Sequence, residues 1–396
     1  MKRVLIYYMD FHSSIGGGEY LSLLLIAELQ KTCEVTLALN WESDVAKAAE
    51  MAGIPVDMAA LKVVLVKPES EFLRRIDAIL PFYRTRQLKK LAKKADVCIS
   101  TANLFDFGKP AHHFVYLLRL MGDNAFIDYY NHVPPLKGAA RFKRKARTFL
   151  AETILRPLLG MRSTRKILAD PREHIYPPSQ YVDSIMRSFY GPFNSTVFYP
   201  PTAFEAGETV VPRDPLRINY LGRVTPEKRV DEIVEIVARA RELSGQPLTL
   251  YLAGHLDETP FIEKLRRTAA GNPWLHLPGP VYGEEKTRFL LSGAYAIHAE
   301  RDEAFGISIT EYLKAGLIPI VPDEGGTVEI VDAPELTYHT PEDAAQILTR
   351  LLRDESFREG LLRHCGERAK LFSAQAYMES QRRTLEKILA GTDGSA

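Results

Sequence analysis

The sequence lacks the features that mark secreted, membrane-spanning and metal-binding proteins. Its 396 residues include three cysteines, Cys33, Cys98 and Cys365, which are odd in number and lie far apart. This spacing provides neither a disulfide framework nor a metal-ligand pattern, and it is typical of a protein in a reducing cytosol. No apolar run approaches the roughly 18 residues of a membrane-spanning helix, and the first apolar run is too short for a signal peptide. We therefore expect a cytoplasmic protein.

A strong net charge is also missing. The formal net charge is +1, so the chain has no overall nucleic-acid-binding signature. Two stretches depart from this balance: residues 74–94 contain eight Lys or Arg and one acid, and residues 137–166 contain ten and one. The second stretch is partly amphipathic at helical spacing, the composition of a helix that lies on the anionic inner face of a membrane. The alternative is a solvated basic face over a core stripe, which is the more common case.

The remaining composition is that of a soluble globular protein with two domains. Hydrophobic residues make up 46% and charged residues 26% of the chain. Strand-length apolar runs alternate with helical segments in both halves, which predicts two doubly wound α/β domains. A polar linker with glycine and prolines, Thr202–Pro215, separates them. We assign 1–205 to the first domain, 206–372 to the second, and 373–396 to a last helix and tail.

The most informative stretch is Glu300–Gly316, ERDEAFGISITEYLKAG. An apolar strand-like run, Ala294–Ala299, precedes it, and a second one, Leu317–Val321, follows. Residues 307–315 have helical length, and Gly316 stands where a glycine ends a helix. The segment therefore predicts a βαβ unit with a short helix.

Two glutamates flank the start of this predicted helix. At about 1.5 Å of rise per residue, Glu303 and Glu311 lie on the order of 8–10 Å apart, on either side of the helix N-terminus. Such an N-terminus can hold a phosphate, and Gly306 allows backbone to approach a ligand closely. Each carboxylate could then accept hydrogen bonds from sugar hydroxyls. For either glutamate alone, the alternative is an ordinary acid that complements the helix dipole or faces solvent.

A second turn carries two cations to the same predicted sheet edge. Arg223 and Lys228 follow the strand at 217–221, and two cations five residues apart can reach one diphosphate. Gly325-Gly326 follows the strand at 317–321. The alternative for the first turn is a basic loop without a ligand.

The first half offers weaker signals. Gly16-Gly17-Gly18 lies between a predicted strand and a predicted helix but does not fit the GxGxxG dinucleotide pattern. It is either a ligand-facing backbone surface or a tight turn. His132 follows a predicted strand at 125–131, at the edge where open α/β sheets bind ligands. A lone histidine is more often structural or simply exposed.

Taken together, these motifs resemble the retaining glycosyltransferases of family 4, the group 1 glycosyltransferases. The stretches that carry the resemblance are GRVTPEK at 222–228, EAFGISITE at 303–311 and the glycine pair at 325–326. The second is similar to the family's E-x7-E motif. With GGGE near the start, YYNHVPP and YPP, the pattern looks closest to the branch of lipid-linked oligosaccharide mannosyltransferases. The resemblance implies the GT-B fold, with two facing Rossmann-like domains, a cleft between them and a last helix that returns to the first domain.

The resemblance also implies roles for individual residues. Glu303 would contact the transferred sugar, and His132 would face it from the first domain. Glu311 would bind the donor ribose. The implied donor-binding set is Gly17, Gly18, Arg223, Lys228, Phe305, Gly306, Ile307, Glu311, Gly325 and Gly326.

The implied activity is metal-independent transfer of a hexose from a nucleotide-diphosphate sugar, with retention and with no cofactor. GDP-mannose is favoured over UDP-sugars, and the acceptor would be a lipid-linked or cell-surface glycan. Cations and helix N–H groups would stabilise the leaving phosphate, so no DxD dyad is needed. We see no carboxylate nucleophile of the glycosidase kind and expect same-face attack. The alternatives are a nucleotide-sugar epimerase and a non-catalytic nucleotide-sugar-binding protein of the same fold.

Two features depart from the family pattern. Tyr312-Leu313-Lys314 stands where small residues often follow the second glutamate. Glu324 adds a negative charge just before the glycine pair. Both put the seating of the donor in question.

Overall fold

The computed structural model divides the chain into two compact units. One contains Met1–Pro200 and Met378–Ala396, and the other contains Pro201–Tyr377. The residues that the structure describes are 1–11, 16–68, 80–116, 126–127, 156–158, 160–202, 204–207 and 209–391. None of the helices in these ranges is both long enough and apolar enough to cross a membrane.

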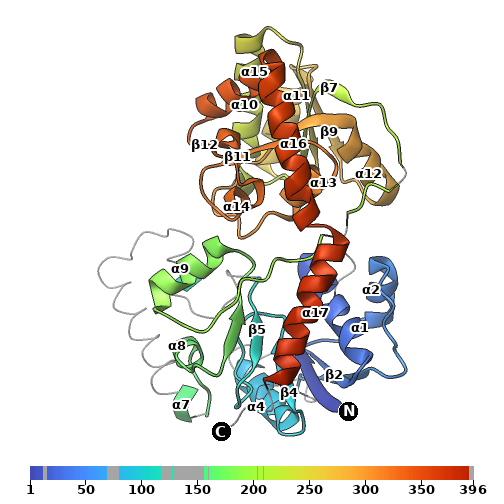
Figure 1. Cartoon of the computed structure of the whole chain (residues 1–396), viewed down its shortest axis with the longest axis vertical. Coiled ribbons are helices and arrows are strands. Elements are labelled where there is room, and N and C mark those ends of the chain that lie inside the picture. Colours follow the sequence, from blue (N-terminus) through green and yellow to red (C-terminus); the bar gives the residue numbers. More distant parts are fainter. Residues whose placement is uncertain are drawn as a thin grey trace. The chain divides into compact units, whose positions relative to one another are not determined.

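The first unit is built on a six-stranded parallel sheet (Figure 1). Its order is β3-β2-β1-β4-β5-β6. The strands are β1 (Lys2–Tyr7), β2 (Cys33–Leu39), β3 (Lys62–Leu65), β4 (Val97–Ser100), β5 (His112–Phe114) and β6 (His174–Tyr176). The helices are α1 (Gly17–Gln30), α2 (Val45–Ala52), α4 (Leu80–Ala92), α7 (Arg156–Leu158), α8 (Thr164–Leu168), α9 (Gln180–Tyr190) and most of α17 (Ala374–Ala390).

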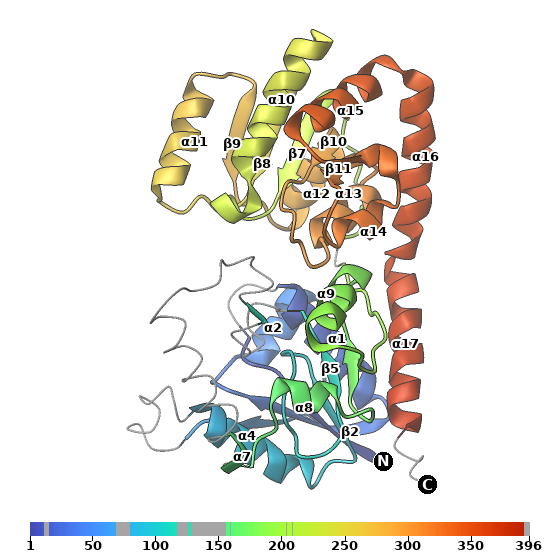
Figure 2. The ribbon, with the colours of Figure 1, turned by 90° about the vertical axis from the view of Figure 1, so that its left-hand side faces the viewer.

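Helix α17 is fastened to the first unit although it ends the chain. Leu385 and Ile388 on this helix are buried, and the Lys2 ammonium donates a hydrogen bond of 2.6 Å to the Leu389 carbonyl. Figure 2 shows this last helix alongside the first unit. The apolar stripe of α17 therefore completes the core of a domain that begins at the other end of the sequence.

The first unit corrects three sequence-based expectations. Gly17 and Gly18 are not loop residues: they form the first turn of α1, which Gly16 and Glu19 cap. Most of the strand predicted at 125–131 lies outside the described residues, and its two described members, Phe126 and Ile127, are helical. The sequence analysis did not predict the short strand β5, because its residues, His-His-Phe, do not form an apolar run of strand length.

The second unit repeats the same design. Its parallel sheet has the order β12-β11-β10-β7-β8-β9. The strands are β7 (Asp214–Leu221), β8 (Thr249–Ala253), β9 (Leu275–Gly279), β10 (Gly293–Ile297), β11 (Ile318–Pro322) and β12 (Thr337–Tyr338). The helical elements are η3 (Pro226–Lys228), α10 (Val230–Ser244), α11 (Pro260–Ala270), α12 (Gly283–Ser292), α13 (Ile307–Lys314), α14 (Thr327–Val331), η4 (Pro334–Leu336), α15 (Pro341–Arg353) and α16 (Glu355–Leu371).

The strand order places a switch point in the middle of each sheet. In the second sheet, β7 and β10 are paired neighbours, and the chain leaves them in opposite directions across the sheet. The loops after two such strands separate, and this opening at the carboxyl edge is where doubly wound domains bind ligands. The loop after β7 carries Arg223 and Lys228, and the loop after β10 carries Glu300 and Glu303.

Candidate functional site

Helix α13 is fixed at both ends by glycine and in the middle by Tyr312. Gly306 caps its N-terminus at φ 105°, and Gly316 follows its C-terminus at φ 74°, conformations that favour glycine. Tyr312 is fully buried, and its hydroxyl accepts a hydrogen bond of 2.6 Å from the Leu221 amide at the end of β7. The large residue that departs from the family pattern therefore ties α13 to the central strand.

The centre of the site is the Lys228 side chain. Proline at the start of η3 turns the chain after β7, so that Lys228 points toward the loop that follows β10. Its ammonium donates to the carboxylates of both Glu300 and Glu303, the latter at 2.6 Å. All three side chains are largely shielded from solvent. The structure thus brings together the predicted residues Lys228 and Glu303 and adds Glu300.

In this cluster the pKa values of the two carboxylates are shifted in opposite directions. Burial, reinforced by the Glu303 charge, raises the pKa of Glu300 to about 7. Burial also opposes ionisation of Glu303, but the Lys228 ammonium together with His298 and the hydrogen bonds of the cluster outweighs burial and lowers the pKa of Glu303 to about 2. Near neutral pH, Glu303 is therefore the ionised partner of Lys228, and Glu300 titrates. The cluster is close to neutral when Glu300 is protonated and negative when it is not.

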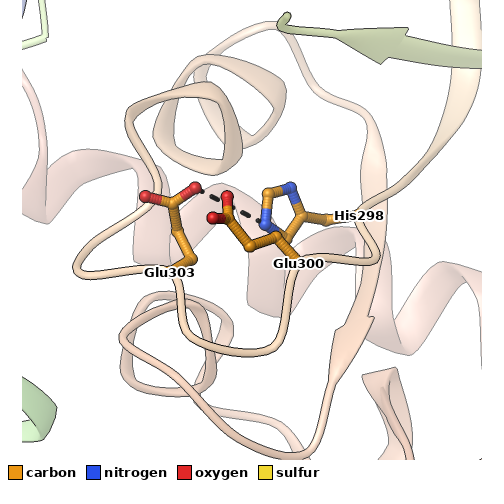
Figure 3. A group of neighbouring side chains, drawn as sticks. All are labelled: His298, Glu300 and Glu303. Carbon is orange, nitrogen blue, oxygen red and sulfur yellow. Dashed lines mark ion pairs between the residues drawn. The ribbon is translucent and has the colours of Figure 1, made fainter. Parts of the chain in front are cut away.

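His298 lies beside Glu300 and Glu303 (Figure 3). Its Nε2 lies 3.7 Å from a Glu303 carboxylate oxygen, and burial lowers the pKa of His298 to about 4. The ligand atoms of His298, Glu300 and Glu303 lie within 4.8 Å of one another, a set that could hold a metal ion. In this arrangement the Lys228 ammonium already serves as the cation for both carboxylates. Independence from metal remains a prediction.

Arg223 lies in the loop after β7, and Glu311 lies on α13. Arg223 is exposed, and its carbonyl accepts a hydrogen bond of 2.7 Å from the buried Tyr220 hydroxyl, which fixes the turn after β7. Glu311 is buried on α13, and its carboxylate accepts a hydrogen bond of 2.7 Å from the Lys286 ammonium of α12. One carboxylate oxygen of Glu311 is therefore held by α12.

The glycine pair after β11 supports the Glu303 loop from behind. A side chain on Gly325 would begin 2.5 Å from the Arg301 carbonyl oxygen, and one on Gly326 would begin 2.4 Å from that of Ala304. The Gly326 amide donates a hydrogen bond of 2.7 Å to the Glu303 carbonyl. Both glycines are thus required by close backbone packing, and this amide is engaged within the protein rather than directed at a ligand.

The extra acid at Glu324 has a positively charged partner. Its carboxylate lies 3.6 Å from the Arg301 guanidinium, which also lies 3.7 Å from Asp323. Arg301 further donates to the His339 carbonyl at 2.7 Å. The Arg301 guanidinium therefore offsets only part of the negative charge before the glycine pair, because Asp323 and Glu232 share it.

The other predicted residues lie at or just before the start of α13, in the first unit or outside the described residues. Phe305 is buried against Phe372, with ring centroids 6.1 Å apart, and Ile307 begins α13. Gly17 and Gly18 belong to the first unit. His132 lies outside the described residues. Sequence reasoning gave Glu300 and His298 no role, although both stand directly after β10, where the carboxyl edge of the sheet begins.

The fold is that of two Rossmann-like domains, and in the second of them the Lys228 cluster lies at the switch point of the sheet. HepE from Anabaena, whose structure was solved with UDP and glucose, has a TM-score of 0.67 at 12% identity, covering 98% of this chain and 100% of that one. WaaG, a glycosyltransferase involved in lipopolysaccharide biosynthesis, has a TM-score of 0.65 at 14% identity, covering 97% and 99%. These likenesses confirm the predicted GT-B fold class.

The sequence of the second unit identifies the family. Residues 203–372 match the family of glycosyl transferases group 1, so this segment is a domain of that family, as the motifs predicted. A D-inositol 3-phosphate glycosyltransferase from Nocardioides is 25% identical over 194 residues. This match covers 44% of the present chain and 42% of the relative, less than half of that protein's length.

Replacing Glu300 by glutamine should remove the loss of stability that ionisation of Glu300 causes as pH rises. Because the pKa of Glu300 is raised in the folded protein, its contribution is present at low pH and falls as pH rises through about 7. Glutamine does not ionise. Relative to wild type, Glu300→Gln should therefore gain on the order of 1–3 kcal/mol of unfolding free energy between about pH 5 and about pH 8.

Urea unfolding followed by Trp274 fluorescence measures this difference in the second unit, in a Trp41→Phe background that removes the other tryptophan. The exposed Glu284→Gln on α12 is the matched control and should show no such gain. A difference between Glu300→Gln and wild type that stays constant with pH would contradict the assigned ionisation.

Proposed function

We propose that this protein is a retaining, metal-independent glycosyltransferase that moves a hexose from a nucleotide-diphosphate sugar to a lipid-linked or cell-surface glycan. The observation that carries the proposal is the Lys228–Glu300–Glu303 cluster beside the N-terminus of α13, at the switch point of a group 1 glycosyltransferase domain. An anionic leaving group needs cations, and sugar hydroxyls can donate hydrogen bonds to carboxylates. This edge of the sheet offers both kinds of group.

The donor diphosphate would lie between Arg223 and the first turn of α13. Helix N–H groups and the Arg223 guanidinium would neutralise the charge that develops on the leaving phosphate. Lys228 uses two of its three N–H donors for carboxylates, which leaves one for a phosphate oxygen. The ionised Glu303 would accept hydrogen bonds from the transferred sugar, and Glu311 would accept one from the ribose.

Retention would follow from attack on the face that the diphosphate leaves. The C1–O bond to the diphosphate breaks as the acceptor oxygen bonds to C1, and the departing phosphate takes the acceptor's proton. In this proposal His132 would face the reacting sugar, and Gly17 and Gly18 would approach the phosphates from the first unit. We favour GDP-mannose, but the test panel includes UDP-glucose, since HepE was solved with it.

Variants of three predicted site residues should distinguish effects on donor binding from effects on turnover. Arg223→Ala should lower the turnover of the preferred nucleotide sugar by about 100-fold or more, because it removes a preorganised charge from the leaving phosphate. Glu303→Gln should lower kcat with little change in KM. Glu311→Gln should mainly raise KM, because it removes a contact that substrate and transition state share. Release of GDP or UDP measures all three.

A thermal-shift panel of GDP- and UDP-sugars selects the donor, since a ligand at about 100 times its Kd adds about 2.7 kcal/mol. Lys264→Met on the exposed face of α11 serves as a control and should behave as wild type. Normal turnover in both Arg223→Ala and Glu303→Gln would show that the site is misassigned.

We further propose a peripheral association with anionic membranes through residues 74–94 and 137–166. Parts of both lie outside the described residues. In the described parts, Lys89 pairs with Asp106 at 2.7 Å, and Arg162 pairs with Asp106 and Glu173. The association therefore rests on the remaining basic residues of these segments.

Co-sedimentation with vesicles tests this association. Binding to vesicles that contain phosphatidylserine should weaken as salt rises from about 50 mM to about 500 mM, because screening shortens the reach of the basic segments. Neutral phosphatidylcholine vesicles are the control. Absence of binding at low salt would remove the membrane from the account.

A further inference from the structure

A cavity lies in the first unit, at the amino edge of its sheet. It has a volume of about 570 Å³ and is bounded by the starts of β4, β5 and β6 and by the last turns of α17. This edge is opposite to the carboxyl edge at which doubly wound domains bind their usual ligands. Its volume is that of a small-molecule site.

One wall of the cavity is a cross-strand pair of histidines. The parallel register of β5 and β6 sets His112 beside His174. The Tyr176 ring stacks on His174 with centroids 4.6 Å apart, and its hydroxyl lies 3.3 Å from Nδ1 of His112. The Nε2 of His174 lies 2.9 Å from the Thr196 hydroxyl. Within the described residues, no hydrogen bond engages Nε2 of His112 or Nδ1 of His174.

The neighbouring His113 shows what a structural histidine looks like in this sheet. It is fully buried, and its Nε2 lies 2.9 Å from the Glu173 carboxylate. His112 and His174 have no such acid. Burial lowers the pKa of His112 to about 3, and burial with the charge of Lys387 lowers the pKa of His174. Both rings are therefore neutral, and each keeps one N–H to donate.

The cavity is also rich in positive charge. Among the described residues, neither Lys109 nor Lys387 forms an ion pair with a carboxylate; Lys109 donates to the Ala95 and Asp96 carbonyls. The carboxylate that lines the cavity, that of Asp96, is already bound by Arg3 at 2.8 Å. The lining thus presents ammonium groups and neutral imidazoles with little negative charge of its own.

We propose that this cavity binds a phosphate monoester. A phosphate offers several acceptor oxygens to the His112 N–H, to the one donor that the hydrogen-bonded His174–Thr196 pair leaves over and to the Asn194 amide, and its charge is balanced by Lys109 and Lys387. A metal cation would be repelled by the same ammonium groups. The bound phosphate would connect Lys387 on α17 with the sheet and so strengthen the attachment of this last helix.

The monoester has two sources with the same chemistry: a soluble phosphorylated metabolite or the headgroup of a phosphorylated lipid. The proposal does not rest on the proposed function, because the cavity lies in a different unit from the Lys228 cluster. Its failure would therefore leave the glycosyltransferase assignment intact, and the reverse also holds.

Histidine-resolved NMR of the full chain, titrated with inorganic phosphate, tests the proposal. The ring resonances of His112 and His174 should move in a saturable way, also in the Arg223→Ala variant, in which phosphate binding at the donor site is weakened. Lys387→Ala should weaken phosphate binding at least about tenfold. The exposed Arg383→Ala, which lies on the same helix, should bind phosphate as wild type does.

Two further experiments distinguish a soluble phosphorylated ligand from a lipid headgroup. Saturable shifts with phenyl phosphate, without Lys387-dependent binding to vesicles of phosphatidylcholine and phosphatidic acid, assign a soluble ligand. Vesicle binding that Lys387→Ala abolishes and Arg383→Ala does not assigns a lipid headgroup. Unmoved histidine resonances, or equal phosphate affinity in Lys387→Ala and wild type, would overturn the proposal.

Discussion

The second unit depends on one interaction, the contact of the Lys228 ammonium with two carboxylates from a different loop. Glu300 and Glu303 are shielded from water, and two ionised carboxylates at such close range would repel each other strongly without the cation. The contact joins the loop after β7 to the loop after β10, so it also sets the shape of the switch point. Removing the ammonium would cost stability as well as any function of the site.

The surrounding structure keeps this contact in place. Tyr312 ties α13 to β7, and Gly325 and Gly326 allow the Glu303 loop to be packed closely from behind. The first residues of α13, Ile307 and Ser308, are half-buried, and Arg223 in the loop after β7 is exposed. In the proposed function, a ligand that carries a diphosphate and a sugar would meet Arg223, Lys228 and the Glu303 carboxylate at this edge of the sheet, and preorganised charges of this kind stabilise a leaving phosphate.

Local sequence patterns predicted much of the fold and the second-unit site. Helix α13, the stop at Gly316 and the turn with Lys228 all follow from signals within a few residues, and the structure has them close to the expected bounds. Glu300 was not assigned a role, because its partner Lys228 is 72 positions away and only the strand order brings them together. Strand β5 was too short to show a pattern, and the glycines at 17 and 18 read as a loop because glycine usually breaks helices.

The central claim is that the Lys228 cluster faces the donor, and the pH dependence of donor affinity tests it most directly. Isothermal titration of the preferred nucleotide sugar should show binding that weakens about tenfold, or about 1.4 kcal/mol, between about pH 6 and about pH 8.5, because ionised Glu300 makes the cluster negative toward the diphosphate. In Glu300→Gln the weakening should disappear. Donor affinity that depends on pH equally in both proteins would contradict the account.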